Sequence, residues 1–100
     1  MVTKNQIIQK LKENYPYLNS NFGLKKIGLF GSYVKGTQLS SSDIDIIVEF
    51  ESPIGINFVE FAEYIEQLIG IKADIITSAG LDGIRNPNIV KSIKETIEYV

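Results

Sequence analysis

The sequence contains no cysteine and no histidine, and these two absences exclude several kinds of site. Without cysteine, the chain forms neither a disulfide framework nor a thiolate metal site. Without histidine, a zinc site is not expected, and any general base has to be a carboxylate. Arginine occurs once and the pI is near 5.0, so we expect no direct binding of nucleic acid. Chemistry in this chain should therefore depend on oxygen ligands.

Long apolar runs are also missing, and none could span a membrane. The first four residues are not followed by the apolar core of a signal peptide, so we expect a cytoplasmic protein. The 100 residues, of which 44% are hydrophobic and 22% charged, suit one soluble globular domain over residues 1–100.

The net charge of −2 conceals two unlike parts of the chain. Residues 1–36 carry six lysines and one glutamate, whereas residues 37–100 carry four basic and eleven acidic side chains. The first part could bring cations to phosphates and the second could bring carboxylates to metals. The alternative is that the lysines cover the solvated face of the first helix.

The first helix has clear signals at its start. Thr3 and Gln6 have the spacing of a capping box. We expect this helix to end near Asn14, because Pro16 disfavours helical geometry at the residue before it. A short second helical turn should follow Pro16 and stop at Gly23.

The remaining pattern predicts an α/β (α+β) protein with a small mixed sheet packed by helices, in the order α-β-α-β-α-β-α with a possible terminal strand. Strands are expected at 24–30, 43–50 and 71–76, and Gly28 should let another backbone approach the first of them. Helical segments are expected at 32–35, at 57–69 with Gly70 as the stop, at 78–81 with Ser78 as the cap, and from Pro87 with Asn86 as the cap. A last strand could lie within 96–100.

A glycine-serine pair and two aspartates stand at the ends of the first two predicted strands. Gly31 allows close backbone approach, and Ser32 with the N–H groups of the following turn could bind a phosphate. Asp43 and Asp45 lie two residues apart, so their backbones are roughly 7 Å apart on one face of a strand. Such paired carboxylates suit Mg²⁺, which takes oxygen ligands from carboxylates and phosphates. Asp74, in an otherwise apolar strand, is the candidate third carboxylate.

Each of these signals is weak alone. An isolated Asp-X-Asp at a strand start is usually a turn or edge feature, and Ser32 could simply cap a short helix. The combination is what favours a metal-and-phosphate site.

Gly-Ser, ten residues and Asp-X-Asp, placed between two strands, resembles the signature of the nucleotidyltransferase superfamily that includes DNA polymerase beta. The chain is most similar to the minimal nucleotidyltransferase (MNT) proteins, often antitoxins of a HEPN toxin. The resemblance implies that Gly31, Ser32 and Lys35 hold the nucleotide phosphates. It also implies that Asp43, Asp45 and Asp74 form the catalytic and metal-binding set. Lys35 stands where many relatives carry arginine, so it keeps the charge but lacks the bidentate fork.

The resemblance further implies an activity, cofactors and a partner. The enzyme would transfer AMP from ATP, with two Mg²⁺ ions, to a tyrosine hydroxyl of a cognate HEPN toxin. The acceptor would come from that partner or from a second copy of the chain, so a hetero-oligomer or homo-oligomer is expected. Tyr17 and Tyr64 could belong to a partner surface, where tyrosine is enriched. Two alternatives stay open: an antitoxin that blocks the toxin by docking alone, and a nucleotidyltransferase acting on a small molecule.

Overall fold

The computed structural model describes residues 3–31, 34 and 43–100. In these ranges, one sheet contains four strands in the order β3-β2-β1-β4. Strand β1 pairs antiparallel with β2 and with β4, whereas β2 and β3 are parallel. The sheet is therefore mixed, as the sequence predicts. The strands are β1 (Leu24–Phe30), β2 (Ile44–Phe50), β3 (Ala73–Thr77) and β4 (Glu98–Tyr99).

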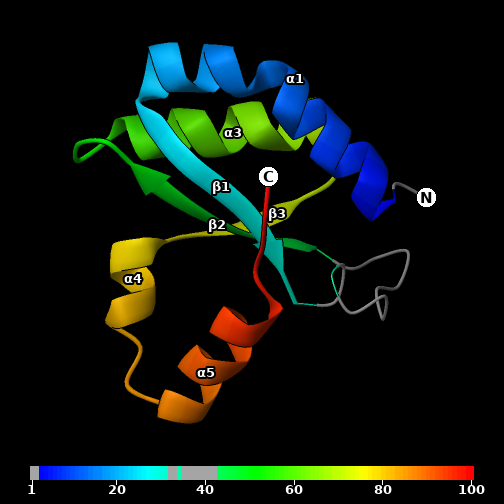
Figure 1. Cartoon of the computed structure of the whole chain (residues 1–100). Helices are drawn as coiled ribbons and strands as arrows, with labels where there is room; N and C mark the ends of the chain where they lie inside the picture. Colours follow the sequence, from blue (N-terminus) through cyan, green and yellow to red (C-terminus); the bar gives the residue numbers. More distant parts are fainter. Residues whose placement is uncertain (1–2, 32–33, 35–42) are drawn as a thin grey trace.

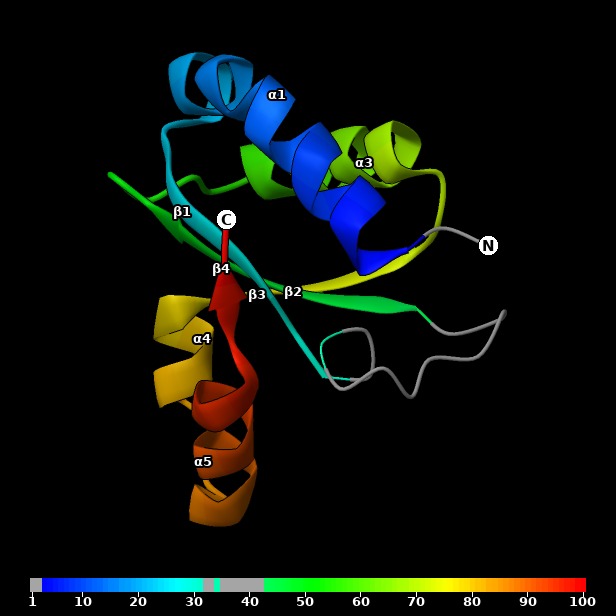
Figure 2. The ribbon, with the colours of Figure 1, turned by 45° about the vertical axis from the view of Figure 1, so that its right-hand side comes forward.

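Four helices cover the two faces of the sheet in the described part of the chain. Helices α1 (Lys4–Phe22) and α3 (Asn57–Ile69) lie side by side on one face (Figure 1). Helices α4 (Ser78–Asp82) and α5 (Pro87–Thr96) lie on the other face (Figure 2). The helix predicted at 32–35 falls almost wholly outside the described residues, of which only Val34 is described, in helical conformation.

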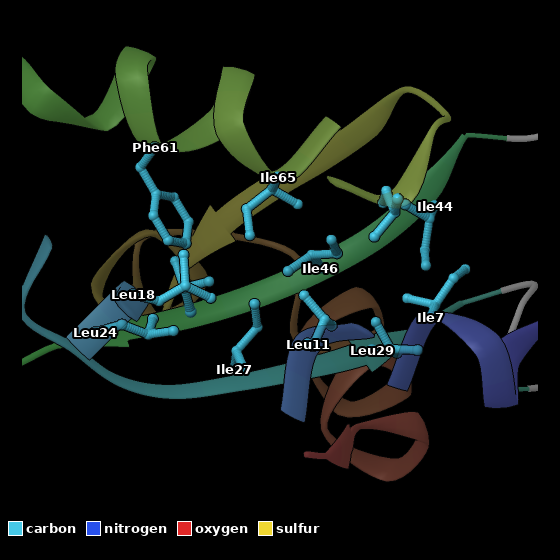
Figure 3. Packing of buried hydrophobic residues seen from close by; sticks show 12 residues of the cluster. Ile7, Leu11, Leu18, Leu24, Ile27, Leu29, Ile44, Ile46, Phe61 and Ile65 are labelled. Atoms are coloured by element: carbon cyan, nitrogen blue, oxygen red, sulfur yellow. The ribbon is translucent and has the colours of Figure 1, made fainter. Parts of the chain in front are cut away.

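The main core lies between the sheet and the pair α1 and α3. Phe61 and Ile65 of α3 point toward β1 and β2, and the buried side chains of α1 close the same space (Figure 3). Their burial removes apolar surface from water and is the main force that fixes the two helices on the sheet. The fully enclosed members of this cluster are Ile7, Leu11, Leu18, Leu24, Ile27, Leu29, Ile44, Ile46, Val48, Phe61, Ile65 and Ile69.

A smaller apolar cluster holds α4 and α5 on the opposite face. Its buried members are Phe30, Ile47 and Leu81. Strand β2 serves both clusters because alternate side chains point to opposite faces: Ile46 enters the main core and Ile47 the smaller one. The strand predicted at 43–50 is confirmed with its start shifted by one residue, to Ile44.

Helix α1 is longer than the sequence predicts. It continues through Pro16 to Phe22 and ends at Gly23, which has a φ of 71°. The prediction of a break near Asn14 is wrong. Leu11 and Leu18, one on each side of the proline, are both buried in the main core, and this burial outweighs the backbone hydrogen bond that Pro16 cannot make. The capping box of Thr3 and Gln6 is confirmed.

The C-terminal elements match their predictions apart from small shifts. Helix α3 ends at Gly70 (φ 78°), and Asn86 caps α5, as predicted. The cap of α4 is Thr77, whose hydroxyl accepts from the Gly80 N–H, so the prediction of Ser78 is wrong by one residue. Strand β3 begins two residues later and ends one residue later than predicted.

The short strand β4 confirms the terminal strand and explains Gly28. Gly28 pairs with Tyr99, and a Cβ on Gly28 would meet the Tyr99 ring at 3.0 Å and the Glu98 carbonyl at 3.1 Å. Glycine therefore allows β4 to close on the edge of β1. None of the helices in the described ranges combines the length and apolar character needed to cross a membrane.

Candidate active site

The site begins at the turn that ends β1. Gly31 follows Phe30 directly and has a φ of +75°, a conformation that side chains with a Cβ rarely adopt. A Cβ on Gly31 would collide with the Asp45 carboxylate oxygen Oδ2. The group packed against this glycine is the carboxylate of Asp45, and the predicted role of Gly31 in phosphate binding stays a prediction.

Asp45 and Asp74 are direct neighbours on parallel strands. The register of β2 and β3 pairs Asp45 with Asp74, and neighbouring strands lie about 4.8 Å apart. Both side chains belong to the sheet face that carries α4 and α5, because Ile47 and Ile76, two residues further along each strand, join the smaller cluster on that face. The sequence predicted these two carboxylates as partners, and the fold brings them together.

Two hydrogen bonds fix the entry into β3. The Ile44 N–H donates to the Lys72 carbonyl at 3.0 Å, which aligns the start of β2 with the start of β3. The Glu66 carboxylate of α3 accepts from the Ala73 N–H at 2.9 Å, one residue before Asp74. Glu66 was not among the candidate site residues predicted from the sequence. Nothing in a single sequence signals that a glutamate in the last helical turn reaches the next strand.

The electrostatics of the site are those of crowded negative charge. Partial burial raises the pKa of Asp45, and the nearby carboxylates of Asp74 and Asp43 raise it further. A cation placed among these groups would relieve the repulsion and stabilise the ionised form. Among the described residues, this crowding of carboxylates suits the set to a positive ligand.

The other predicted site residues have different outcomes. Asp43 is exposed and lies just before the first residue of β2. Ser32 and Lys35 lie outside the described residues, so their predicted phosphate contacts stay predictions. Within the described ranges, no three acidic side chains form a ready-made metal cage. Mg²⁺ commonly takes one or two protein carboxylates and completes its shell with substrate phosphates and water, so Asp45, Asp74 and the adjacent Asp43 fit it chemically.

The predicted partner-surface tyrosines contact each other. The rings of Tyr17 and Tyr64 stack with their centroids 5.0 Å apart, and the Tyr64 hydroxyl donates to Asn14 Oδ1 at 3.2 Å. Tyr17 remains 46% exposed. This pair links α1 to α3, and a role at a partner surface stays a prediction.

The family model described as "Nucleotidyltransferase domain" matches residues 4–100. A protein of Methanocaldococcus jannaschii that carries a provisional protein adenylyltransferase name is 40% identical over all of both chains. Protein adenylyltransferase MntA of Thermococcus cleftensis is 36% identical over all of this chain and 98% of its own length.

Two solved structures show the same fold. A provisionally identified minimal nucleotidyltransferase superposes with a TM-score of 0.72 and 21% identity, over 98% of this chain and 95% of that one. A toxin–antitoxin crystal structure with AMP-PNP gives a TM-score of 0.62 and 28% identity, over 95% of this chain and 69% of that one.

Proposed function

The chain belongs to the nucleotidyltransferase domain family, and we propose that it is a Mg²⁺-dependent protein adenylyltransferase that transfers AMP from ATP to a tyrosine of a cognate HEPN toxin. The curated relative in Thermococcus cleftensis is named a protein adenylyltransferase and matches the whole chain. A similar solved structure is a toxin–antitoxin complex with AMP-PNP, a nucleotide analogue. Both support an AMP-transferring antitoxin.

One observation supports this proposal most strongly: Gly31 after β1, Asp45 of β2 and Asp74 of β3 lie next to one another. Gly31 leaves room for the Asp45 carboxylate, and the parallel register sets Asp74 directly beside Asp45. A purely structural role does not account for two aspartates side by side, because like charges on neighbouring strands are destabilising. A cation bound between the two carboxylates would offset this repulsion.

Asp43, Asp45 and Asp74 are the residues that would hold Mg²⁺. When bound, the metal supplies positive charge that stabilises the attacking and leaving oxygens. The carboxylates orient that charge from the rigid ends of β2 and β3, and Glu66 keeps the start of β3 in place. Gly31, Ser32 and Lys35 would hold the phosphates of ATP, through backbone N–H groups, a hydroxyl and an ammonium group.

The proposed reaction is a displacement at the α-phosphorus of ATP. The tyrosine oxygen forms a bond to that phosphorus, the bond to the bridging oxygen of pyrophosphate breaks, and the hydroxyl proton is released. The products are AMP-tyrosine and pyrophosphate. The chain's own contribution is to position the reactants and stabilise charge at the site.

The test is transfer of label from α-labelled ATP to a HEPN toxin purified with this chain, followed by mass spectrometry of the labelled residue. We expect Mg²⁺-dependent addition of AMP to a tyrosine. Full transfer by the variant that combines Asp43→Asn with Asp45→Asn would refute the proposal. If the double variant labels nothing but still protects cells from the toxin as well as the natural chain, neutralisation is by docking alone.

A further inference from the structure

In the described part of the chain, Asp45 and Asp74 lie on the sheet face that the main core leaves uncovered. Helices α1 and α3 and the main core cover the opposite face, whereas Asp45 and Asp74 belong to the face of α4 and α5 (Figure 2). Asp74 is exposed and Asp45 half-buried. The side of the molecule that α4 and α5 occupy is therefore a route by which an acceptor could reach Asp45.

A groove lies on the sheet face that carries α4 and α5. Its inner part, about 370 Å³, is lined by Ile47, Ser78, Leu81, Lys94, Ile97 and Tyr99. Ile47 stands two residues from Asp45 on the same face of β2, which is about 7 Å along the strand. Ile47 therefore places the inner part of the groove on the same sheet face as Asp45.

The outer part of the groove runs between α4 and α5 and is larger, about 600 Å³. Leu81 and Lys94 line both parts, so the two parts adjoin. Ile84 and Val90 give the outer part an apolar floor, and Arg85 gives it a charged rim. We call the two parts together the α4–α5 groove.

The α4–α5 groove carries more basic than acidic side chains. Arg85, Lys91 and Lys94 line it together with one acidic residue, Glu95, although residues 37–100 as a whole carry eleven acidic and four basic side chains. Lys91 makes a long, exposed ion pair with Glu95 at 4.0 Å. Over the described residues, neither Arg85 nor Lys94 takes part in an ion pair. These two cations are available to a ligand.

We propose that the α4–α5 groove is the docking site for an acidic segment of the acceptor protein, anchored by apolar side chains, which delivers its hydroxyl to Asp45. The inference rests on the proposed function, since it names the surface by which that acceptor arrives. Arg85 and Lys94 pair with the carboxylates of the segment, and the floor of Leu81, Ile84 and Val90 receives its apolar residues. Charge complementarity of this kind speeds encounter and fixes register.

The probes are two fluorescein-labelled 12-residue peptides with a central tyrosine and two leucines. One has aspartate and glutamate in the flanks, and the other has asparagine and glutamine at the same positions. Binding is measured by fluorescence anisotropy, and AMP transfer by label from α-labelled ATP. We expect the acidic peptide to bind about tenfold more tightly than its neutral partner, with the difference shrinking at high salt.

The decisive variant reverses both rim charges, Arg85→Glu with Lys94→Glu. We expect it to bind the acidic peptide at least about tenfold more weakly than the natural chain does. The matched control, Lys10→Glu with Lys12→Glu on exposed positions of α1, makes the same change in net charge away from the groove and should change affinity less than about twofold.

Several results would overturn the docking inference: equal binding of both peptides, no binding of either, or equal losses in the two charge-reversed variants. A matching loss of ATP affinity in the groove variant would assign these cations to the nucleotide and also overturn it. Acidic-peptide binding without AMP transfer leaves the docking site standing and counts against the proposed function. Equal AMP transfer to both peptides counts against the docking site and supports the proposed function.

Discussion

Gly31 occupies a position where both backbone and packing require glycine. Its φ of +75° is costly for any residue with a Cβ, and such a Cβ would also overlap Asp45 Oδ2. The two effects can be separated, because Gly70 has nearly the same φ, 78°, and a Cβ added there would meet no atom within 4 Å. The comparison isolates the contact that shapes the site.

Gly31→Ala should lower the free energy of unfolding by about 2–4 kcal/mol, from backbone strain plus overlap with Asp45. Gly70→Ala should cost only about 1–2 kcal/mol, from strain alone. Urea denaturation measures both. In a chain that already carries Asp45→Ala, Gly31→Ala should lower the free energy of unfolding by no more than Gly70→Ala does. An unchanged effect of Gly31→Ala in that chain would contradict this explanation of Gly31.

Asp45 should destabilise the metal-free protein at neutral pH. Its pKa is raised in the folded state by burial and by Asp74 and Asp43, so the ionised form costs stability that is present in acid and lost as pH rises through that pKa. Asp45→Asn should therefore raise the melting temperature at about pH 7 by roughly 2–4 °C, since a solvent-screened carboxylate contributes about 0.5 kcal/mol.

Calorimetry without metal, at neutral pH and again in acid, tests this. The increase in melting temperature should shrink as the pH falls, because the Asp45 carboxylate of the natural chain then becomes protonated and is neutral like the asparagine that replaces it. Glu63→Gln, an exposed change on α3, is the control and should have little effect. A lower melting temperature for Asp45→Asn at neutral pH would show that the ionised carboxylate has a stabilising partner in the free protein.

At the scale of elements, sequence reasoning succeeded where local signals and burial agree. The alternation of β2, the apolar spacing of α3, the capping box of α1 and the Asn86-Pro87 start of α5 all predict what the structure contains. It failed at Pro16, where local backbone preference conflicts with the burial of Leu11 and Leu18. The position of β3 shifted because its start depends on Glu66 and on pairing with β2, which are contacts between distant residues.

Replacing Pro16 should make the protein more stable. Pro16→Ala restores a helical N–H and removes the proline ring from the middle of α1, so we expect a gain of about 1–3 kcal/mol in the free energy of unfolding. Pro87→Ala is the matched control, because Pro87 stands in the first turn of α5, where proline is favourable. The denaturation midpoints of the two variants and the natural chain test this prediction. A lower midpoint for Pro16→Ala would mean that a bend at Pro16 is needed for the packing of α1 on the sheet.

At the scale of the whole molecule, the order of elements could be predicted from sequence and the carboxylates could be named as candidates, but the exact contacts between them could not. The spacing from Gly31 to Asp45 and the isolated Asp74 marked the candidates, and the resemblance to minimal nucleotidyltransferases agrees with the family found. The register that pairs Asp45 with Asp74, and the contact of Asp45 with Gly31, follow from three-dimensional pairing alone. The α4–α5 groove likewise needs the packing of α4 and α5 on the sheet.

The central claim is that the Asp45–Asp74 pair is the catalytic centre for AMP transfer. The most direct measurement is the initial rate of label transfer from α-labelled ATP to the purified HEPN toxin, with Mg²⁺, for the natural chain and for Asp74→Asn, with Glu63→Gln as the matched control on α3. We expect Asp74→Asn to lose at least about a hundredfold in rate and Glu63→Gln to stay near the natural rate, because Asp74 pairs with Asp45 in the sheet whereas Glu63 is an exposed residue of α3. An Asp74→Asn variant that transfers AMP at the natural rate would contradict the account.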